Sequence, residues 1–351
     1  MKRVVAASRR SEGMLTVVFP WALVVGVLAS LAAAGAVAIA ETSWIGRTFP
    51  GFFVLPNRVV ASIARPDWGG TRNGALFQRL VVEVDGAPVA TSGDVYRLAD
   101  EHRDETVSYT LRDGARSDVV AVPTQVFSRL DYLAVFGAYA ATGLLYLLLG
   151  LFAVAVLPTA TGRAILVLGG VAGVYSLSAA GMYDAGATLR LHALAEALFP
   201  AALVQLSLTY PGPAQLATRP ATPLAGWVGA AWFLSAALAL AYQLLLYEPS
   251  AYSALHAASE TYLGLAGLGL AVRLVCELAT APSGCSPLLR GATAGAVLGL
   301  GLPAVVVGLS GLTGGVVPVN VVVTTAFLFP LCLGWGLLRE QRMPAGAPAV
   351  S

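Results

Sequence analysis

The chain has 351 residues, of which 57% are apolar and only 11% are charged. This composition excludes an ordinary water-soluble domain and is typical of a protein that crosses a lipid bilayer repeatedly, because each helical crossing needs about 20 apolar residues. The formal net charge is only +2. The bilayer is therefore the first expected partner, and no nucleic-acid partner is expected.

Eight apolar segments are predicted to span the bilayer as helices, because a hydrocarbon interior offers no partner to an unpaired backbone amide. In chain order they cover residues 15–40, 132–157, 164–183, 193–210, 224–247, 262–280, 292–312 and 316–338. Prolines occupy many of the breaks, where they stop helices. Pro200, Pro303 and Pro330 fall inside spans and are expected to kink them.

Charge is concentrated in one stretch near the amino end, where ten arginines and eleven acidic residues lie between Glu41 and Arg129. This concentration divides the chain into five expected parts. They are a cytoplasmic N-terminus (1–14), the first span (15–40), an extracytoplasmic domain (41–130), a membrane domain of seven helices (131–338) and a cytoplasmic tail (339–351).

The short loops predict the orientation, because Lys and Arg are retained on the cytoplasmic side. With the N-terminus inside, nine basic residues fall on the cytoplasmic side, whereas the short outer loops hold only Arg190. We therefore expect a multi-pass protein of a bacterial inner (cytoplasmic) membrane with both termini cytoplasmic and the charged domain outside. A cleaved signal peptide is the alternative for residues 15–40, but a run of about 26 residues favours an uncleaved anchor.

The charged domain alternates strand-like and helical patterns. Strands are predicted at 51–54, 59–63 and 80–84, the last followed by a tight Asp85-Gly86 turn, and a hairpin is predicted between 107–111 and 119–122 around Asp113-Gly114. Thr91 or Ser92 is expected to cap a helix whose apolar face includes Val95 and Leu98.

This order of elements resembles a bacterial PDZ domain, and its most specific piece is the Val-Asp-Gly-Ala-Pro-Val turn at 84–89. The expected fold class is therefore a polytopic α-helical membrane protein of about eight helices with one small α+β PDZ-like extracytoplasmic domain. The resemblance implies capture of a peptide or protein by strand addition at a sheet edge. The implied groove residues are Gly51, Phe52, Phe53, Val54, Val95 and Leu98. A closed groove that only spaces or dimerises the protein is the open alternative.

The membrane part resembles the polytopic input region of bacterial sensor histidine kinases of the competence and quorum-sensing type. The similarity rests on the outer domain after span one and on Leu-Ser-Leu-Thr-Tyr-Pro at 206–211, Ser286-Pro287 before Arg290, Phe-Pro-Leu at 329–331 and Gly-Trp-Gly-Leu-Leu-Arg at 334–339. The resemblance implies signal transduction in a two-component system. The chain contains no transmitter domain, so a cytoplasmic kinase or signalling partner, or a longer parent chain, is expected to supply it.

The catalytic alternatives lack the residues that they need. The chain has three histidines and no His-Glu-x-x-His motif, which removes the zinc intramembrane proteases. Gly308-Leu309-Ser310-Gly311 resembles a rhomboid serine motif, but no histidine follows Ser310, so small-residue helix packing is the favoured interpretation. We expect no enzyme activity, no metal and no cofactor.

Ionisable residues within the spans are the remaining candidates, because charge in hydrocarbon is costly. His192 and Glu196 lie one turn apart, Gln205 lies deeper on the same helix, and Arg273 and Glu277 are four apart. His192 and Glu196 fit either an outward-facing ligand pocket or plain helix–helix hydrogen bonding, and the latter is favoured.

Taken together, the patterns predict a membrane-embedded sensory module. A peptide, lipophilic signal or partner protein would bind outside, and the last helix would relay this event to the cytoplasm, with a homodimer as a further expected arrangement. A transporter or membrane scaffold is the alternative.

Overall fold

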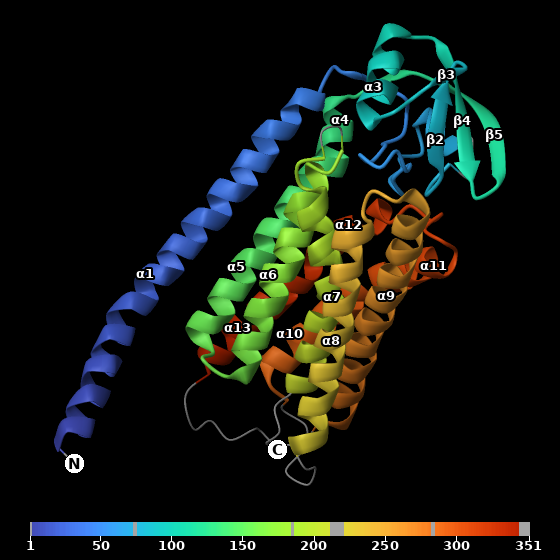
Figure 1. The fold of residues 1–351 in the computed structure, drawn as a ribbon. Coiled ribbons are helices and arrows are strands. Elements are labelled where there is room, and N and C mark those ends of the chain that lie inside the picture. The colour runs from blue at the N-terminus through green and yellow to red at the C-terminus, as the bar shows by residue number, and fades with distance from the viewer. Residues whose placement is uncertain (1, 73–75, 184–185, 211–220, 282–284, 344–351) are drawn as a thin grey trace.

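The computed structural model describes residues 2–72, 76–183, 186–210, 221–281 and 285–343. Long helices form a bundle, and a lobe containing α3 and strands β2–β5 covers one end of it (Figure 1). The first helix, α1 (Lys2–Ala40), leans away from the others, and the last, α13 (Leu328–Gln341), ends on the side of the bundle opposite the lobe (Figure 1).

Seven helices in the described part are long and apolar enough to cross a bilayer. They cover Trp21–Trp44, Arg129–Val156, Ala160–Ala180, Leu189–Thr209, Ala225–Leu245, Pro249–Thr280 and Pro287–Leu312. The helices that form these spans after the first are α5 (Ala138–Val156), α6 (Ala160–Ala180), α7 (Leu189–Thr209), α8 (Ala221–Leu245), α9 (Pro249–Thr280), α10 (Pro287–Gly295) and α11 (Leu302–Leu312). The chain is thus a multi-pass, largely helical membrane protein, and the first seven predicted spans correspond to these helices.

The predicted eighth span, 316–338, is divided between α12 (Asn320–Ala326) and α13, with Phe327 as a turn between them. Pro330 explains the break, because proline has no N–H to donate to the carbonyl four residues earlier. That carbonyl belongs to Ala326, and the Tyr146 hydroxyl donates to it instead at 3.3 Å. A side chain of α5 therefore satisfies the backbone group that the proline leaves open.

A second proline has a similar local effect. Pro303 lies at the start of α11, directly after a π-helical segment, η3 (Ala296–Gly301). Another π-helical segment, η2 (Leu133–Gly137), follows the short α4 (Arg129–Tyr132) and leads into α5. Single π-helical turns inside α-helices widen the backbone hydrogen-bond pattern locally and often occur at functional sites.

Glycines bring several helices into close contact. A Cβ on Gly169 would lie 2.5 Å from the Tyr146 carbonyl oxygen, and one on Gly264 would lie 2.5 Å from the Cα of Gly308. Helices α6 and α9 can therefore approach α5 and α11 only because these positions lack side chains. Gly308, part of the serine-like motif, is placed here as a packing residue.

The lobe contains a four-stranded antiparallel sheet in the order β3-β2-β4-β5. Its strands are β2 (Leu80–Val84), β3 (Ala87–Pro88), β4 (Thr106–Asp113) and β5 (Arg116–Pro123). Both predicted turns are confirmed: β4 and β5 pair up to Asp113 opposite Arg116, and β2 turns into β3 through Asp85 and Gly86, both at positive φ. Thr91 caps α3 (Ser92–Glu101), as predicted.

The strands predicted at 51–54 and 59–63 are not formed. Only single bridges join Val54 to Val60 and Val59 to Leu80. Gly51, the first residue of the first predicted strand, has a positive φ of 73°, which an extended strand does not adopt. Arg58, directly before the second predicted strand, has a φ of 65°, so the two segments meet in a turn and touch only through these bridges. Nearby, β1 (Thr48–Phe49) instead pairs with β6 (Gln125–Val126), and a single helical turn, α2 (Gly69–Arg72), precedes β2.

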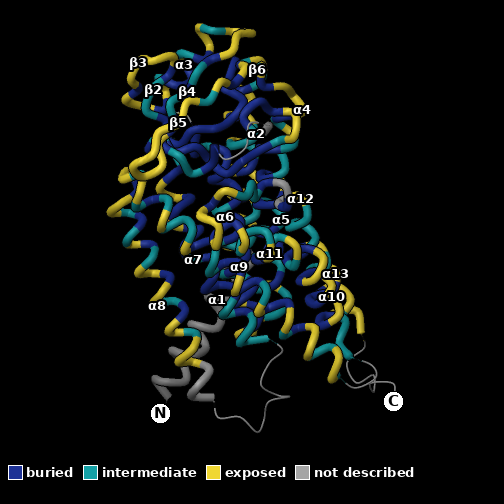
Figure 2. Tube along the Cα trace, turned by 90° about the vertical axis from the view of Figure 1, so that its right-hand side faces the viewer, coloured by how far each residue is buried: buried dark blue, intermediate teal, exposed yellow. Residues whose placement is uncertain are grey.

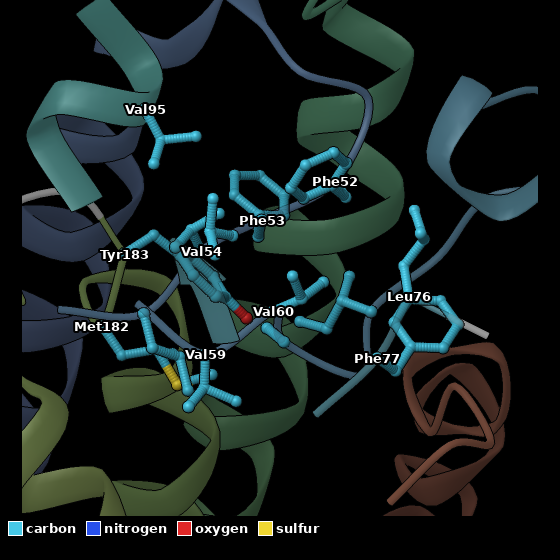
Figure 3. Packing of buried hydrophobic residues seen from close by; sticks show 14 of the residues in the cluster. Phe52, Phe53, Val54, Val59, Val60, Leu76, Phe77, Val95, Met182 and Tyr183 are labelled. Atoms are coloured by element: carbon cyan, nitrogen blue, oxygen red, sulfur yellow. The ribbon is translucent and has the colours of Figure 1, made fainter. Parts of the chain in front are cut away.

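The core of the lobe continues into the helices. One cluster of buried apolar side chains includes Phe53 of the lobe, Tyr183 after α6 and Tyr242 of α8. Phe53 and Tyr183 are stacked with ring centroids 4.3 Å apart, as the close view shows (Figure 3). Buried segments accordingly run from the lobe into the adjoining helix ends (Figure 2). The lobe is therefore packed onto the bundle rather than tethered to it.

Candidate functional site

The residues of the predicted groove lie together, but inside the core of the lobe. Phe52, Phe53, Val54 and Val95 are buried (Figure 3), and Leu98 packs against the same cluster. The Tyr96 hydroxyl of α3 is hydrogen-bonded to both backbone polar groups of Val54. The Val54 N–H donates to this hydroxyl at 2.8 Å, and the hydroxyl donates to the Val54 carbonyl at 3.1 Å. The backbone groups that strand addition at this position would use are therefore bonded within the chain.

The candidate residues inside the membrane fall into three separate places. Gln205 accepts a hydrogen bond from the Trp232 indole N–H at 2.9 Å, which joins α7 to α8. Arg273 and Glu277 face each other along α9 at 3.8 Å and are only partly buried. His192 and Glu196, by contrast, are nearly inaccessible, with 6% and 2% of their surface exposed.

Glu196 is the centre of a polar cluster formed by α7, α8 and α9. Its Oε1 accepts from the Tyr242 hydroxyl at 2.7 Å and from His256 Nδ1 at 3.0 Å. The other nitrogen of His256, Nε2, lies 3.4 Å from Oε1 of Glu260, one turn further along α9. Because a carboxylate only accepts hydrogen bonds, His256 bridges the two acidic groups by presenting a nitrogen to each.

His192 completes the cluster on the side of α6. Its Nδ1 lies 3.0 Å from the Tyr175 carbonyl oxygen, which can only accept, so Nδ1 carries the proton. Its Nε2 points toward Glu196 Oε2 at 4.0 Å, and its ring stacks on the Tyr175 ring at 4.5 Å. Histidine, glutamate and tyrosine thus bind one another in a buried site.

Sequence reasoning missed Tyr242, His256 and Glu260. The signal for the last two was present, because His256 and Glu260 have the same four-residue spacing as His192 and Glu196. The predicted sixth span began at Tyr262, which left both residues in a loop, whereas α9 begins at Pro249. Tyr242 carried no signal, since a tyrosine in an apolar helix is ordinary.

The lobe is hydrogen-bonded to the segment that precedes the last helices. The Asn320 side chain pairs with both backbone polar groups of Ala64, at 3.0 and 2.9 Å. The Val319 N–H donates to the Ser62 carbonyl at 3.2 Å, and the Ser62 hydroxyl donates to the Gly315 carbonyl. This strip of lobe backbone is therefore held directly against the start of α12.

A buried carboxylate secures the opposite side of the junction. Asp131 of α4 accepts from the Trp68 indole N–H at 2.8 Å, and Arg65 Nη1 lies 2.9 Å from the same oxygen. Asp131 also forms a capping box with Ser128 at the start of α4. One side chain thus joins the lobe to the helix that begins the second span.

Three hollows lie near these groups. An apolar cavity of about 80 Å³ lies within the bundle, between α5, α6, α7, α9, α11 and α12. A smaller one of about 30 Å³ lies under the lobe and is lined by His192 and His256. A cleft of about 560 Å³ separates the β4–β5 hairpin from the loop between α8 and α9. Within the described ranges, no three His, Cys, Asp or Glu side chains are grouped so as to hold a metal.

These features define a multi-pass membrane protein whose lobe is built into one end of its bundle. In comparisons with known proteins, no protein family, no curated protein and no solved structure matches the chain.

Proposed function

We propose that the chain is a receptor-like module of a bacterial inner membrane, with the lobe outside and both termini in the cytoplasm. A ligand or partner binds at the lobe or at the adjoining helix ends, and the last helix passes the change to a cytoplasmic signalling partner. The excess of basic residues in the loops opposite the lobe supports this orientation.

The observation that carries the proposal is the pairing of Ala64 with Asn320. Residues 62–64 of the lobe are bonded to 315–320, and α12 and α13 follow directly. A displacement of this strip would pull on the start of α12, and the break at Phe327 would let α13 respond as a separate unit. Relay through such an element requires two arrangements that a ligand can bias.

The proposal is tested in living cells with a photo-crosslinking amino acid at Arg342, an exposed position that directly follows α13. We expect a discrete crosslinked protein whose yield changes when Asn320→Ala is introduced. The same amino acid at Trp227, which is 68% exposed on α8, is the control and should give no such product. Absence of a discrete product at Arg342, or a yield indifferent to Asn320→Ala, would contradict the receptor assignment.

One observation favours a transporter as the second candidate. The apolar cavity lies beside Pro303, which follows a π-helical segment, and Ala326, where α12 ends in a turn, and broken helices around a central cavity are common in carriers. Flux of small apolar solutes into proteoliposomes, absent from empty liposomes, would support this alternative over the receptor.

A further inference from the structure

We propose that the three hollows form one binding path for a compact amphiphile, with a single aromatic ring or short alkyl chain as its body and a neutral or cationic hydrogen-bond donor as its head. The inference deepens the proposed receptor function by naming its ligand class. The molecule would enter from the cleft beside the lobe, and its body would come to rest in the apolar cavity.

The hollows are joined through shared lining residues. Gln78 lines both the outer cleft and the small cavity under the lobe. Tyr139, Tyr175 and Val319 line both that small cavity and the apolar cavity below it. Each hollow is thus adjacent to the next, and a rotamer change of a shared residue such as Gln78 or Tyr175 would connect them.

Gln78 lies between the cleft and the small cavity under the lobe, where its side chain would control entry. It has a positive φ of 60°, an uncommon conformation for a residue other than glycine. Its Nε2 donates to the Ser62 hydroxyl at 2.9 Å, and this assignment of the amide is sound because the Ser62 hydroxyl uses its own proton on Gly315.

The amide oxygen of Gln78 indicates that the head of the ligand is a hydrogen-bond donor. Oε1 of Gln78 is buried and, within the described residues, accepts no hydrogen bond. A buried acceptor without a donor is costly, by about 1–3 kcal/mol, and is relieved when a ligand supplies an N–H or O–H. A donor head passing or resting here would satisfy this oxygen.

The lining of the path changes from polar in the upper cavity to apolar in the lower cavity, which matches a ligand with a donor head and an apolar body. The upper cavity is lined by His192, His256 and Tyr252, and behind the histidines lie Glu196 and Glu260. His256 lies between the two carboxylates, so the cluster holds two anionic groups against one imidazolium, and its remaining negative charge disfavours an anionic head and favours a donor. The lower cavity is walled mainly by apolar side chains, including Phe199, Leu203, Leu263, Leu300, Val307 and Val322.

The size of the lower cavity limits the body of the ligand. A dry apolar cavity of about 150 Å³ accommodates benzene, so a cavity of about 80 Å³ suits at most one ring after small side-chain movements. The π-helical segment beside Leu300 and the break near Ala326 are places where such adjustment is easiest.

The test uses the full chain in lipid nanodiscs and three light-activated probes of the same size class: 4-azidophenol, 4-azidoanisole and 4-azidobenzoate. We expect 4-azidophenol to label the segments around Tyr175 and Val322, saturably and displaceably by excess phenol. The anisole, which lacks the donor, should label these segments about fivefold less, as expected for one lost hydrogen bond. The anionic benzoate should not label them above background.

Two matched variants locate the site. Val322→Phe fills the lower cavity and should abolish the displaceable labelling, whereas Val275→Phe, on a position of α9 that is 44% exposed, should leave it unchanged. Gln78→Met keeps the side-chain length but removes the acceptor, and it should reduce the preference for phenol over anisole. Unfolding temperatures of all variants show whether each is folded.

Labelling by 4-azidophenol that excess phenol does not displace, or that persists in folded Val322→Phe, would overturn the proposed path. Equal labelling by the benzoate would overturn the assignment of the head group. If Val322→Phe does not fold, an unchanged preference for phenol over anisole in Gln78→Met would overturn the proposed path instead. The receptor assignment is judged separately, because crosslinking at Arg342 does not depend on any of these probes.

Discussion

Asn320 at the start of α12 pairs with Ala64 of the lobe as a neighbouring strand would, although 256 residues separate them. Its Oδ1 accepts from the Ala64 N–H at 3.0 Å, and its Nδ2 donates to the Ala64 carbonyl at 2.9 Å. Both partners are buried. A single side chain thereby satisfies backbone groups that have no strand partner among the described residues.

Replacing this side chain should therefore loosen the lobe from the helices. Asn320→Ala leaves the buried N–H and C=O of Ala64 unpaired, and we expect a loss of about 2–4 kcal/mol in the free energy of unfolding. Asn320→Asp keeps the acceptor for the Ala64 N–H but turns a buried carboxylate oxygen toward the Ala64 carbonyl, and it should cost at least as much. Denaturant-driven unfolding in mixed micelles measures both. Ser117→Ala, on an exposed position of β5, is the control and should change stability by less than about 0.5 kcal/mol.

The elements that local chemistry determines could be predicted from the sequence. The β4–β5 hairpin follows from Asp113-Gly114, and the start of α3 follows from a capping residue, Thr91, directly before a helical pattern. The apolar runs likewise predicted the membrane helices, because their length and hydropathy alone suffice.

Features that depend on distant residues could not be predicted in this way. The strand expected at 51–54 is replaced by a buried segment whose Val54 is held by Tyr96, 42 residues away. In the candidate site, the four-residue spacing of His192 and Glu196 suggested a contact, but only the packing of α7 against α9 shows that His256 faces the same carboxylate. The periodicity of apolar and polar residues along one helix does not indicate which other helix it packs against.

The hydroxyl of Tyr242 should contribute strongly to the polar cluster. It donates to Glu196 Oε1 at 2.7 Å in a buried site, and hydrogen bonds to charged groups are worth about 1.5–3 kcal/mol. We expect Tyr242→Phe to lower the free energy of unfolding by about this amount. Tyr247→Phe, on a residue of the same region that is 52% exposed, is the matched control. Equal effects of the two substitutions would contradict the role given to this hydroxyl.

Asp131 should be among the most sensitive positions at the junction. Asp131→Ala leaves the Arg65 guanidinium and the Trp68 indole N–H without this acceptor and removes the capping box of α4. Breaking a buried charged pair in this way typically costs about 3–5 kcal/mol. Asp118→Ala, which removes an exposed carboxylate from its pair with Arg79, should cost less than about 1 kcal/mol. Unfolding curves of the two variants, recorded side by side, distinguish the two kinds of pair.

The cap of α3 should make the lobe less stable in acid. The Thr91 N–H and the Thr91 hydroxyl each donate to Asp94 Oδ2 at 2.9 Å, and the Ala90 N–H donates at 3.1 Å. These donors, the Thr91 N–H first, hold the pKa of Asp94 below its usual value of 3.8. The unfolded chain therefore takes up this proton at a higher pH than the folded chain does.

It follows that the stabilisation by Asp94 is complete above about pH 5 and declines as the pH falls through the lowered pKa of the folded state. Asp94→Asn should thus destabilise the protein at about pH 6, by an amount within the range of about 0.5–2 kcal/mol known for helix caps, and the difference from wild type should shrink toward about pH 3. Unfolding free energies of both proteins across this range provide the measurement. A difference that stays constant with pH would show that the charge of Asp94 is not what the cap uses.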